Sequence, residues 1–250
     1  MSELTGLYAL WYREFKVFLR ERSRIVSALV QPLMWLIIFG TGLGSTIAIT
    51  GVNYQAFIYP GILCMTVLFG SLFFGLYIIM DKRVDFLKEV LVAPLSRTTI
   101  FFGKVLGGAT DGIIEILILL ALGGLFFGIH FTLYSLTISI IMILLLMVSI
   151  VSLGLAIGSL MSSPEGFGLV TSFLIFPLFF LSGALFPINN LPKWLYAFVA
   201  MNPVSYTVDG LRTVILGLSG FGLGMDLAVT AAFAIIMVAI GTWAFSRMKM

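Results

Sequence analysis

The chain has 250 residues, of which 10% are charged and 60% are hydrophobic, and its mean hydropathy is +1.16. An ordinary soluble domain carries about 25% charged residues. This composition excludes a soluble globular enzyme, a disordered chain and a nucleic-acid-binding protein, for which the net charge of +3 is also too small. The sequence therefore indicates an integral membrane protein. The single cysteine, Cys64, lies in an apolar run, which excludes a disulfide framework and a cysteine-based metal site.

The first residues predict an amphipathic helix over 4–22 rather than a secretory signal. Apolar side chains recur there at helical spacing: Leu4, Leu7, Tyr8, Trp11, Phe15, Phe18 and Leu19. Charged side chains occupy the other face: Arg13, Glu14, Lys16, Arg20 and Glu21. We expect this helix to lie in the membrane surface, and a cytosolic helix packed on a partner is the alternative. The first apolar run begins only at Ile25 and is too long for a signal peptide.

Long uncharged runs predict membrane-spanning helices, because a hydrocarbon core about 30 Å thick takes about 20 apolar residues to cross. The sequence predicts six spans, at about 25–43, 56–80, 105–128, 135–161, 167–186 and 227–245. Residues 162–166 are expected to form a loop, and Pro187 is expected to end the fifth span. Because the apolar runs are continuous rather than alternating, the expected fold class is an all-α integral membrane protein.

Residues 187–226 differ from the spans. Their apolar run at 194–201 covers only about eight residues, which is too short to cross a membrane. We expect two short helices here that dip into the membrane interface. Each is expected to begin at a capping asparagine, Asn190 or Asn202, with Pro192 or Pro203 close behind it.

Lysine and arginine positions predict the orientation in the membrane. If the N-terminus is inside, the inner segments hold five such residues before the first span, five in the 81–104 loop and two at the C-terminus, which makes 12 of the 14. The outer segments hold Lys193 and Arg212. Since cytoplasmic loops are enriched in these residues, we expect both termini to be cytoplasmic and residues 187–226 to be external.

The loop at 81–104 carries a short amphipathic segment. Val84, Leu87, Val90 and Leu91 form an apolar stripe, charged residues that include Glu89 surround it, and Pro94 ends any helix there. Such a segment suits docking of a soluble partner. Packing on the membrane or on the chain's own helices is an equally open alternative.

Two acidic residues lie within the third predicted span. Asp111 and Glu115 are four residues apart and so share one helical face. A charge at membrane depth costs about 2.5–3.5 kcal/mol on insertion scales, so both should face protein or water rather than lipid. They are candidates for a polar site in a transport path or for proton coupling. A structural contact with a neighbouring helix is the alternative.

A capped segment follows at 202–212. Asn202 caps a helix, Pro203 begins it, and Tyr206, Asp209 and Arg212 follow at intervals of three residues. Asp209 and Arg212 have the spacing of a helical ion pair. Taken alone, this is a well-capped interfacial helix.

Several kinds of catalytic motif are absent from the sequence. No GxxxxGK[ST] stretch occurs that would cradle nucleotide phosphates, and no HExxH or GxSxG motif is present. The single histidine, His130, lies at a predicted membrane boundary and excludes a histidine-rich metal cluster. We therefore expect a protein that is not itself an enzyme and holds no metal.

The chain resembles the permease subunits of type-2 ABC exporters. The pattern N-P-x-x-Y-x-x-D-x-x-R at 202–212 resembles that family's signature near the last span, and residues 89–97 resemble its first cytoplasmic loop. The surface helix, the six spans and the short external helices extend the resemblance over essentially the whole chain. The loop departs from the family pattern at 85–89, where a small residue or threonine is expected near the middle.

The resemblance implies a single type-2 transmembrane domain over 1–250, in the cytoplasmic membrane. Two permease copies, taken as a homodimer, would form the pore, and two separate ATP-binding subunits would supply ATP and Mg without a cofactor on the permease itself. The coupling helix in a cleft of the ATPase would comprise Val84, Leu87, Glu89, Val90, Leu91 and Pro94. The helix at 4–22 would also contact the ATPase, and the helices at 190–212 would gate the outer exit.

The substrate class implied is an amphipathic drug-like or lipid-like molecule, with a lipid-linked oligosaccharide or polysaccharide as the alternative. Two readings from other classes stay open on the residues alone. One is an ion-coupled secondary transporter that uses Asp111 and Glu115. The other is a membrane-embedded enzyme or assembly factor.

Overall fold

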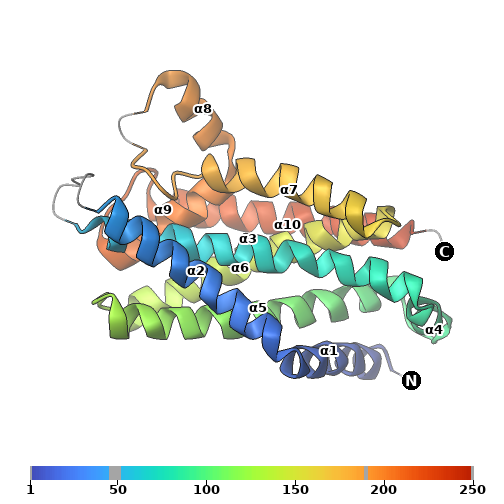
Figure 1. Ribbon diagram of the computed structural model, residues 1–250. Coiled ribbons are helices and arrows are strands. Elements are labelled where there is room, and N and C mark those ends of the chain that lie inside the picture. The colour runs from blue at the N-terminus through green and yellow to red at the C-terminus, as the bar shows by residue number, and fades with distance from the viewer. Residues whose placement is uncertain (1, 45–51, 189–190, 249–250) are drawn as a thin grey trace.

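The computed structural model describes residues 2–44, 52–188 and 191–248, without the side chains of Arg24, Lys88 and Leu91. The elements in these ranges are ten α-helices, which confirms the all-α class. They are α1 (Glu3–Arg20), α2 (Arg22–Gly42), α3 (Tyr54–Arg83), α4 (Phe86–Val92), α5 (Arg97–Phe126), α6 (Leu133–Leu160), α7 (Pro164–Phe180), α8 (Lys193–Met201), α9 (Pro203–Leu216) and α10 (Leu223–Ser246). The long helices run along a common axis (Figure 1). We call the two ends of this bundle the α4 end, which carries α1 and α4, and the α9 end, which carries α8 and α9.

Five helices of the described chain are long and apolar enough to cross a membrane: α2, α3, α5, α6 and α10. The fifth expected span, 167–186, corresponds to α7, which has 17 residues and ends at Phe180. The helix stops early because the chain turns there, with Gly183 in the left-handed region at φ 70° and the Ser182 hydroxyl bound to the Phe179 carbonyl. The expected end at Pro187 is therefore wrong, and the sixth span stays a prediction.

Several helices start earlier than the sequence predicted, and local capping explains the starts of α5 and α7. α5 begins at Arg97 rather than near residue 105, because the Ser96 side chain accepts a hydrogen bond from the Thr99 backbone N–H. α7 begins at Pro164, inside the expected loop, because Ser163 caps the Gly166 N–H and proline fits the first helical position. The segment between α3 and α5 is consequently short, and most of it is α4.

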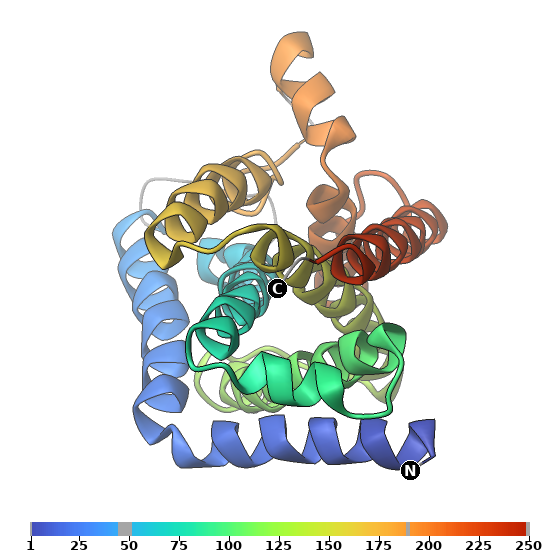
Figure 2. The ribbon, with the colours of Figure 1, turned by 90° about the vertical axis from the view of Figure 1, so that its right-hand side faces the viewer.

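The centre of the bundle is the contact between α3 and α6 (Figure 2). Gly75 of α3 faces Gly154 and Gly158 of α6 so closely that a Cβ at Gly75 or Gly158 would overlap the facing backbone carbonyl. The small-residue motif Gly154-x-x-x-Gly158 is thus used for close packing. In contrast, Gly128 has no neighbour within 4 Å of an added Cβ, so the similar motif at 124–128 has a turn rather than a packing role.

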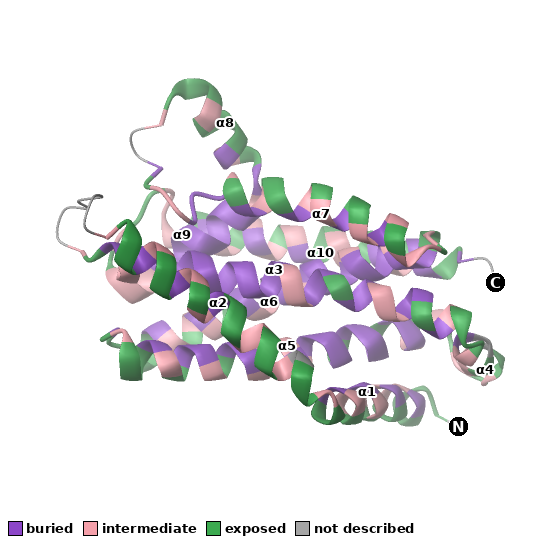
Figure 3. Ribbon diagram, viewed as in Figure 1, coloured by how far each residue is buried: buried purple, intermediate pink, exposed green. Residues whose placement is uncertain are grey.

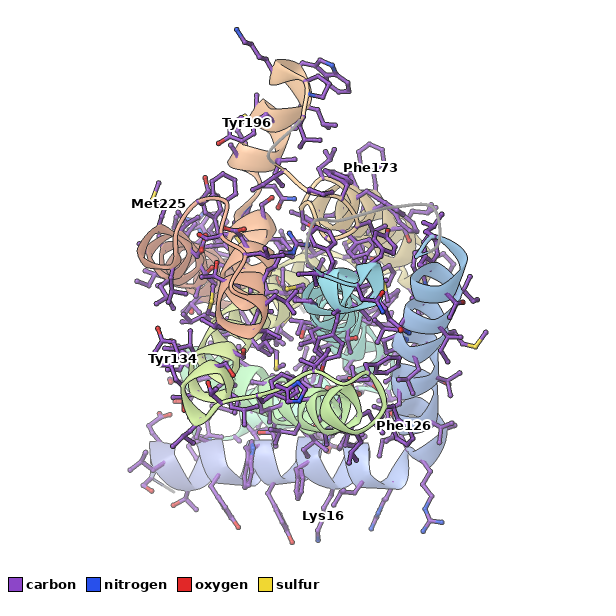
Figure 4. All side chains as sticks on the ribbon, turned by 90° about the vertical axis from the view of Figure 1, so that its left-hand side faces the viewer. Lys16, Phe126, Tyr134, Phe173, Tyr196 and Met225 are labelled. Carbon is purple, nitrogen blue, oxygen red and sulfur yellow. The ribbon has the colours of Figure 1, made fainter. Side chains whose placement is uncertain are left out.

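The N-terminal helix α1 lies crosswise to the spans at the α4 end (Figures 1 and 2). It crosses α5, where Gly103 and Gly107 leave room for Leu10 and Glu14. Lys16 points away from the bundle (Figure 4). Glu14 is buried in this contact, so its expected place on the outward charged face is wrong. The carboxylate of Glu14 lies inside because it forms an ion pair with the buried Lys104, as described below.

Many residues on the outer faces of the helices are exposed (Figure 3), and a number of them are large and apolar. Exposed large side chains follow three of the helices: Val26, Val30, Met34, Ile37 and Ile38 on α2; Leu169, Val170, Phe173, Phe176 and Phe180 on α7; Met225, Ile235, Ile236, Ile240 and Trp243 on α10. A soluble monomer rarely exposes so much contiguous apolar surface. This distribution fits a surface that contacts lipid or another protein chain.

Candidate functional site

The helix α4 forms a cap at one end of the bundle, between α3 and α5. Asp85 precedes it in a left-handed conformation with φ 56°, which turns the chain sharply after α3. The helix ends at Val92, before Pro94, as the sequence predicted. This placement presents a seven-residue helix at the α4 end.

The side chains of the predicted apolar stripe do not share one surface. Leu87 is 2% exposed and packs in a core cluster with Leu10, Ile78 and Phe101, so its expected place on the docking surface is wrong. Val84 is the C-cap residue of α3 rather than part of α4, and Val90 is half-buried. The Leu91 side chain lies outside the described residues. Among the side chains that the structure describes in residues 84–94, the exposed ones are Val84, Asp85, Glu89, Val92 and Pro94.

A cluster of four charged side chains lies beneath α4. The Lys104 ammonium of α5 is 2.6 Å from Asp81 Oδ2 of α3 and 3.1 Å from Glu14 Oε1 of α1. The guanidinium of Arg13 lies 2.7 Å from Glu14 Oε1 and 3.3 Å from Asp81 Oδ1. Lys104 is 1% exposed, and both carboxylates are buried. The two cations and two anions therefore balance one another, as buried charges require.

This ion cluster joins α4 to the rest of the bundle. The Arg13 guanidinium lies 3.9 Å above the ring of Phe86, the first residue of α4. Such a cation–π contact contributes about 0.5–1 kcal/mol at partly exposed sites. Arg13, Asp81 and Lys104 thereby link α4 to α1, α3 and α5. Apart from charged residues beside the apolar runs, no pattern in the sequence predicted this cluster.

Other charged residues tie the helix termini together at the α4 end. The Lys82 ammonium donates to the carbonyls of Gly158, Ser159 and Met161, at 3.1, 2.7 and 3.2 Å, which satisfies the C-terminus of α6. Arg97 Nη1 donates to the carbonyls of Ser246 and Met248, at the end of α10.

The carboxylate of Glu3 ties α1 to the start of α5. It accepts from the Ser96 backbone N–H and from the hydroxyls of Ser96 and Thr99. The hydrogen bond from Thr99, followed by the backbone bond from Ser96, holds the pKa of Glu3 below its usual value. The start of α1 is therefore anchored on the segment that follows α4.

At the α9 end, the segment 202–212 forms a buried helix. The Asn202 side chain accepts from the Val204 N–H at 3.0 Å, and Pro203 is the first helical residue, as predicted. The Asn202 amide also donates to the Leu178 carbonyl of α7 at 2.8 Å. The Tyr206 hydroxyl donates to the Ala200 carbonyl, and its ring stacks on Phe221 at 4.6 Å.

Asp209 and Arg212 are both buried, and each binds backbone atoms instead of forming the expected helical ion pair. The Asp209 carboxylate accepts from the N–H groups of Gly220 and Phe221, at 2.8–3.0 Å. Arg212 Nη2 donates to the carbonyls of Gly183, Ala184 and Phe57, and its guanidinium lies 3.8 Å over the Phe57 ring. Burial lowers the pKa of Arg212 to about 10, while Asp209 opposes that shift.

The burial of α9 shows how this helix is held. It packs against α3, α6 and α10, and its expected position at the membrane interface stays a prediction. The segment 202–212 therefore holds together the two loops that follow α7 and α9. The preceding helix, α8, starts at Lys193 after Pro192, and the expected cap Asn190 lies outside the described residues. α8 projects away from the bundle (Figures 1 and 2).

The two acidic residues of α5 face protein, as the cost of a lipid-exposed charge predicted. Asp111 is buried, and so is Glu115, one turn further along the helix. Glu115 lines a cavity of about 490 Å³ together with α2 and α3. The other walls include Gln31, Met65, Phe69, Phe73 and Tyr77. An apolar cavity with a few polar groups and this volume is typical of a small-molecule site.

No cluster of three or more histidine, cysteine, aspartate or glutamate side chains that would hold a metal occurs in the ranges that the structure describes. Cys64 is buried in the apolar core. The described residues thus provide a buried ion cluster, an exposed face on α4 and a mainly apolar cavity.

Comparison with known proteins gives the family. A family model of the ABC-2 type transporter matches residues 5–216. The chain belongs to this family. It is 34% identical over 211 residues to ycf38 of Cyanophora paradoxa, which carries the name of a transport permease; the match covers 82% of this chain and 72% of the relative.

Two bacterial relatives match over greater lengths. The inner membrane transport permease YadH of Escherichia coli K12 is 28% identical over 243 residues, which cover 94% of this chain and 90% of YadH. Nodulation protein J of Rhizobium meliloti is 26% identical over 252 aligned positions, covering 97% and 93% of the two chains. The chain is thus a multi-pass transport permease, and permeases of this family generally work with an ATP-binding subunit.

Proposed function

We propose that this chain is the membrane subunit of an ATP-driven exporter. The whole of 1–250 acts as one transmembrane domain in the cytoplasmic membrane, with both termini cytoplasmic and with α7 as the sixth span. Two copies form the translocation path, and two separate ATP-binding subunits hydrolyse ATP with Mg. The permease itself is not catalytic and binds no cofactor.

The observation that carries this proposal is the ion cluster beneath α4. A docking helix can transmit a displacement only if it is rigidly joined to the spans. Phe86 meets Arg13, and the Arg13–Glu14–Lys104–Asp81 contacts bind α1, α3 and α5 into one unit. The exposed surface of α4 is then the place where an ATP-binding subunit docks. We assign Val84, Glu89, Val92 and Pro94 to this surface, and Leu87 to its attachment.

A tagged permease tests this assignment by co-purification. Val92 is 83% exposed on α4, so Val92→Asp should leave folding intact and reduce recovery of a P-loop protein by at least tenfold. The matched control is Leu133→Asp at the opposite end, where Leu133 is 84% exposed. Equal recovery of the ATP-binding protein with both variants would overturn the docking assignment.

For the substrate, we propose an amphipathic drug-like or lipid-like molecule. The cavity between α2, α3 and α5 supports this choice, because its walls are mainly apolar and its volume of about 490 Å³ suits a ligand of drug size. The test is ATP-dependent transport in vesicles with a panel of substrates. Transport of lipid-linked oligosaccharide or polysaccharide, without transport of hydrophobic drugs, would replace this class by the alternative.

Asp111 and Glu115 distinguish an ATP-driven exporter from an ion-coupled transporter. We expect Asp111→Asn and Glu115→Gln to alter substrate transport without creating or removing a dependence on the proton gradient. Transport that follows a proton gradient in the absence of ATP, and that both variants abolish, would favour the secondary transporter.

A further inference from the structure

Asp226 is a buried carboxylate at the α9 end that the proposed function does not use. It lies in the first turn of α10, is 0% exposed, and neither of its oxygens has a hydrogen-bond partner among the described residues. The preceding residue, Met225, points away from the bundle (Figure 4). Asp226 faces α9 instead: a Cβ added to Gly210 would lie 3.1 Å from the Asp226 Cβ.

Neither α10 itself nor α5 or α6 places a positively charged side chain near Asp226. Asp226 is the one charged residue in the sequence of α10, and the sequence of α6 has none. α5 touches α10 near the other end, where Phe101 faces Gly241. The charged and titratable groups that α9 brings near are Tyr206, Asp209 and Arg212.

None of these α9 groups neutralises Asp226. Asp209 is itself an acid, and its oxygens are bound to the N–H groups of Gly220 and Phe221. Arg212 donates toward Gly183, Ala184 and Phe57, on the side of α9 that faces α3 and the loop after α7. The Tyr206 hydroxyl donates to the Ala200 carbonyl.

The nearby hydroxyl groups are also engaged. Thr230, one turn beyond Asp226 on α10, forms a hydrogen bond with Thr207 of α9 at 3.2 Å, and both side chains are buried. An ionised Asp226 would therefore be an unpaired buried charge beside a second carboxylate, which is strongly unfavourable. Addition of a proton to the carboxylate removes that charge.

We propose that Asp226 is a proton-binding site, and that the bound proton allows α9 to close against α10. Loss of the proton places a second negative charge next to Asp209 and opposes the contact between the two helices. Because α9 carries the 202–212 segment that organises the loops at this end, the state of Asp226 controls whether the α9 end is closed. The proposal does not depend on an ATP-binding subunit.

Isotope-edited infrared spectroscopy tests the bound proton directly. The full-length permease, labelled with ¹³C-aspartate and held in lipid nanodiscs at neutral pH, should show the C=O band of a protonated aspartic acid. The band should disappear in Asp226→Asn and persist in Asp111→Asn, the matched buried aspartate on α5. Absence of the band from the unsubstituted protein would overturn the proposal whether or not the variants fold. A band that is lost in Asp111→Asn and kept in Asp226→Asn would also overturn it.

A thiol-labelling experiment tests the link to closure. In a Cys64→Ala background, Thr230→Cys places a buried thiol beside the α9–α10 contact, and a membrane-impermeant reagent reports its exposure. With Asp226 present, labelling should rise by up to about tenfold per pH unit beyond the rise seen with Asp226→Asn, since one proton is released. Equal rises in the two backgrounds would show that Asp226 does not control the contact.

Discussion

The ammonium of Lys104 lies 2.6 Å from the carboxylate of Asp81, and this buried contact joins the start of one span to the end of another. Glu14 completes the contact from the crosswise helix α1. Lys104 is 1% exposed, so water cannot take over its contacts with the two carboxylates. The α4 end is consequently a rigid unit, and its rigidity can be tested by substitutions within the cluster.

Replacement of Lys104 should be strongly destabilising. Lys104→Met keeps the length of the side chain but leaves two buried carboxylates with Arg13 as the remaining cation. Removal of one partner from a buried ion pair costs about 3–5 kcal/mol. We expect this loss in thermal or denaturant unfolding of the purified permease. Lys16→Met, an outward-pointing lysine on α1, should change stability by less than about 0.5 kcal/mol. Similar stabilities for the two variants would contradict the role of the cluster.

Arg13 should act on coupling more than on stability. Its side chain is 35% exposed, so Arg13→Lys should cost less than about 1 kcal/mol in unfolding. Lysine keeps the charge but lacks the planar group that lies over Phe86. In proteoliposomes with the ATP-binding subunit, we expect ATP hydrolysis to continue while substrate transport falls. Full transport by Arg13→Lys would show that the contact with Phe86 is not required.

Arg212→Ala should unfold the α9 end rather than act as a surface substitution. The change removes hydrogen bonds to the carbonyls of Gly183, Ala184 and Phe57 and leaves those buried acceptors unsatisfied. We expect a loss of about 3 kcal/mol in unfolding free energy and poor expression. Lys193→Ala, an exposed cation on α8, is the control and should be neutral. Normal stability of Arg212→Ala together with defective transport would instead favour a direct role in the path.

A methyl group at the α3–α6 contact should be tolerated poorly. In Gly154→Ala the new Cβ would overlap the Leu72 carbonyl, so the central helices must separate, at a cost of about 1–3 kcal/mol. Gly168→Ala is the matched control on α7, because no atom lies within 4 Å of its added Cβ. That control should gain about 0.5–1 kcal/mol. We expect the melting temperature to fall in Gly154→Ala and to rise in Gly168→Ala. A stabilised Gly154→Ala would contradict this packing.

Acid should loosen the start of α1. The pKa of Glu3 is lowered in the folded protein, so its contribution to stability is complete at pH values above the ordinary pKa of 4.5. That contribution is lost as the pH falls through the lowered pKa. Hydrogen exchange of the α1 amides should therefore increase on acidification in the native chain. In Glu3→Gln the exchange should be faster already at pH 7 and less sensitive to acid. If acidification increased hydrogen exchange equally in the native chain and in Glu3→Gln, the increase would come from groups other than Glu3.

The amino-acid sequence by itself determined the class of protein and the positions of most helices. Apolar runs of sufficient length predict spans because each residue adds a fixed rise and each lipid-exposed charge carries a large cost. Local capping rules placed Asn202 and Pro203 at the start of α9, and Pro94 after α4. These properties depend on residues within a few positions of one another and on the membrane. They can therefore be predicted from periodicity and composition.

Tertiary structure alone decided which polar side chains meet. Glu14, Asp81 and Lys104 lie on three different helices, and their spacing along the chain gave no reason to join them. Leu87 is buried rather than exposed because it joins a core cluster with Leu10 of α1 and Phe101 of α5, which other parts of the chain bring to it. Asp209 and Arg212 bind loops instead of each other because α9 is inserted between α3, α6 and α10. Helical periodicity defines the face on which a residue lies, whereas the neighbour that the face meets depends on how the helices pack in three dimensions.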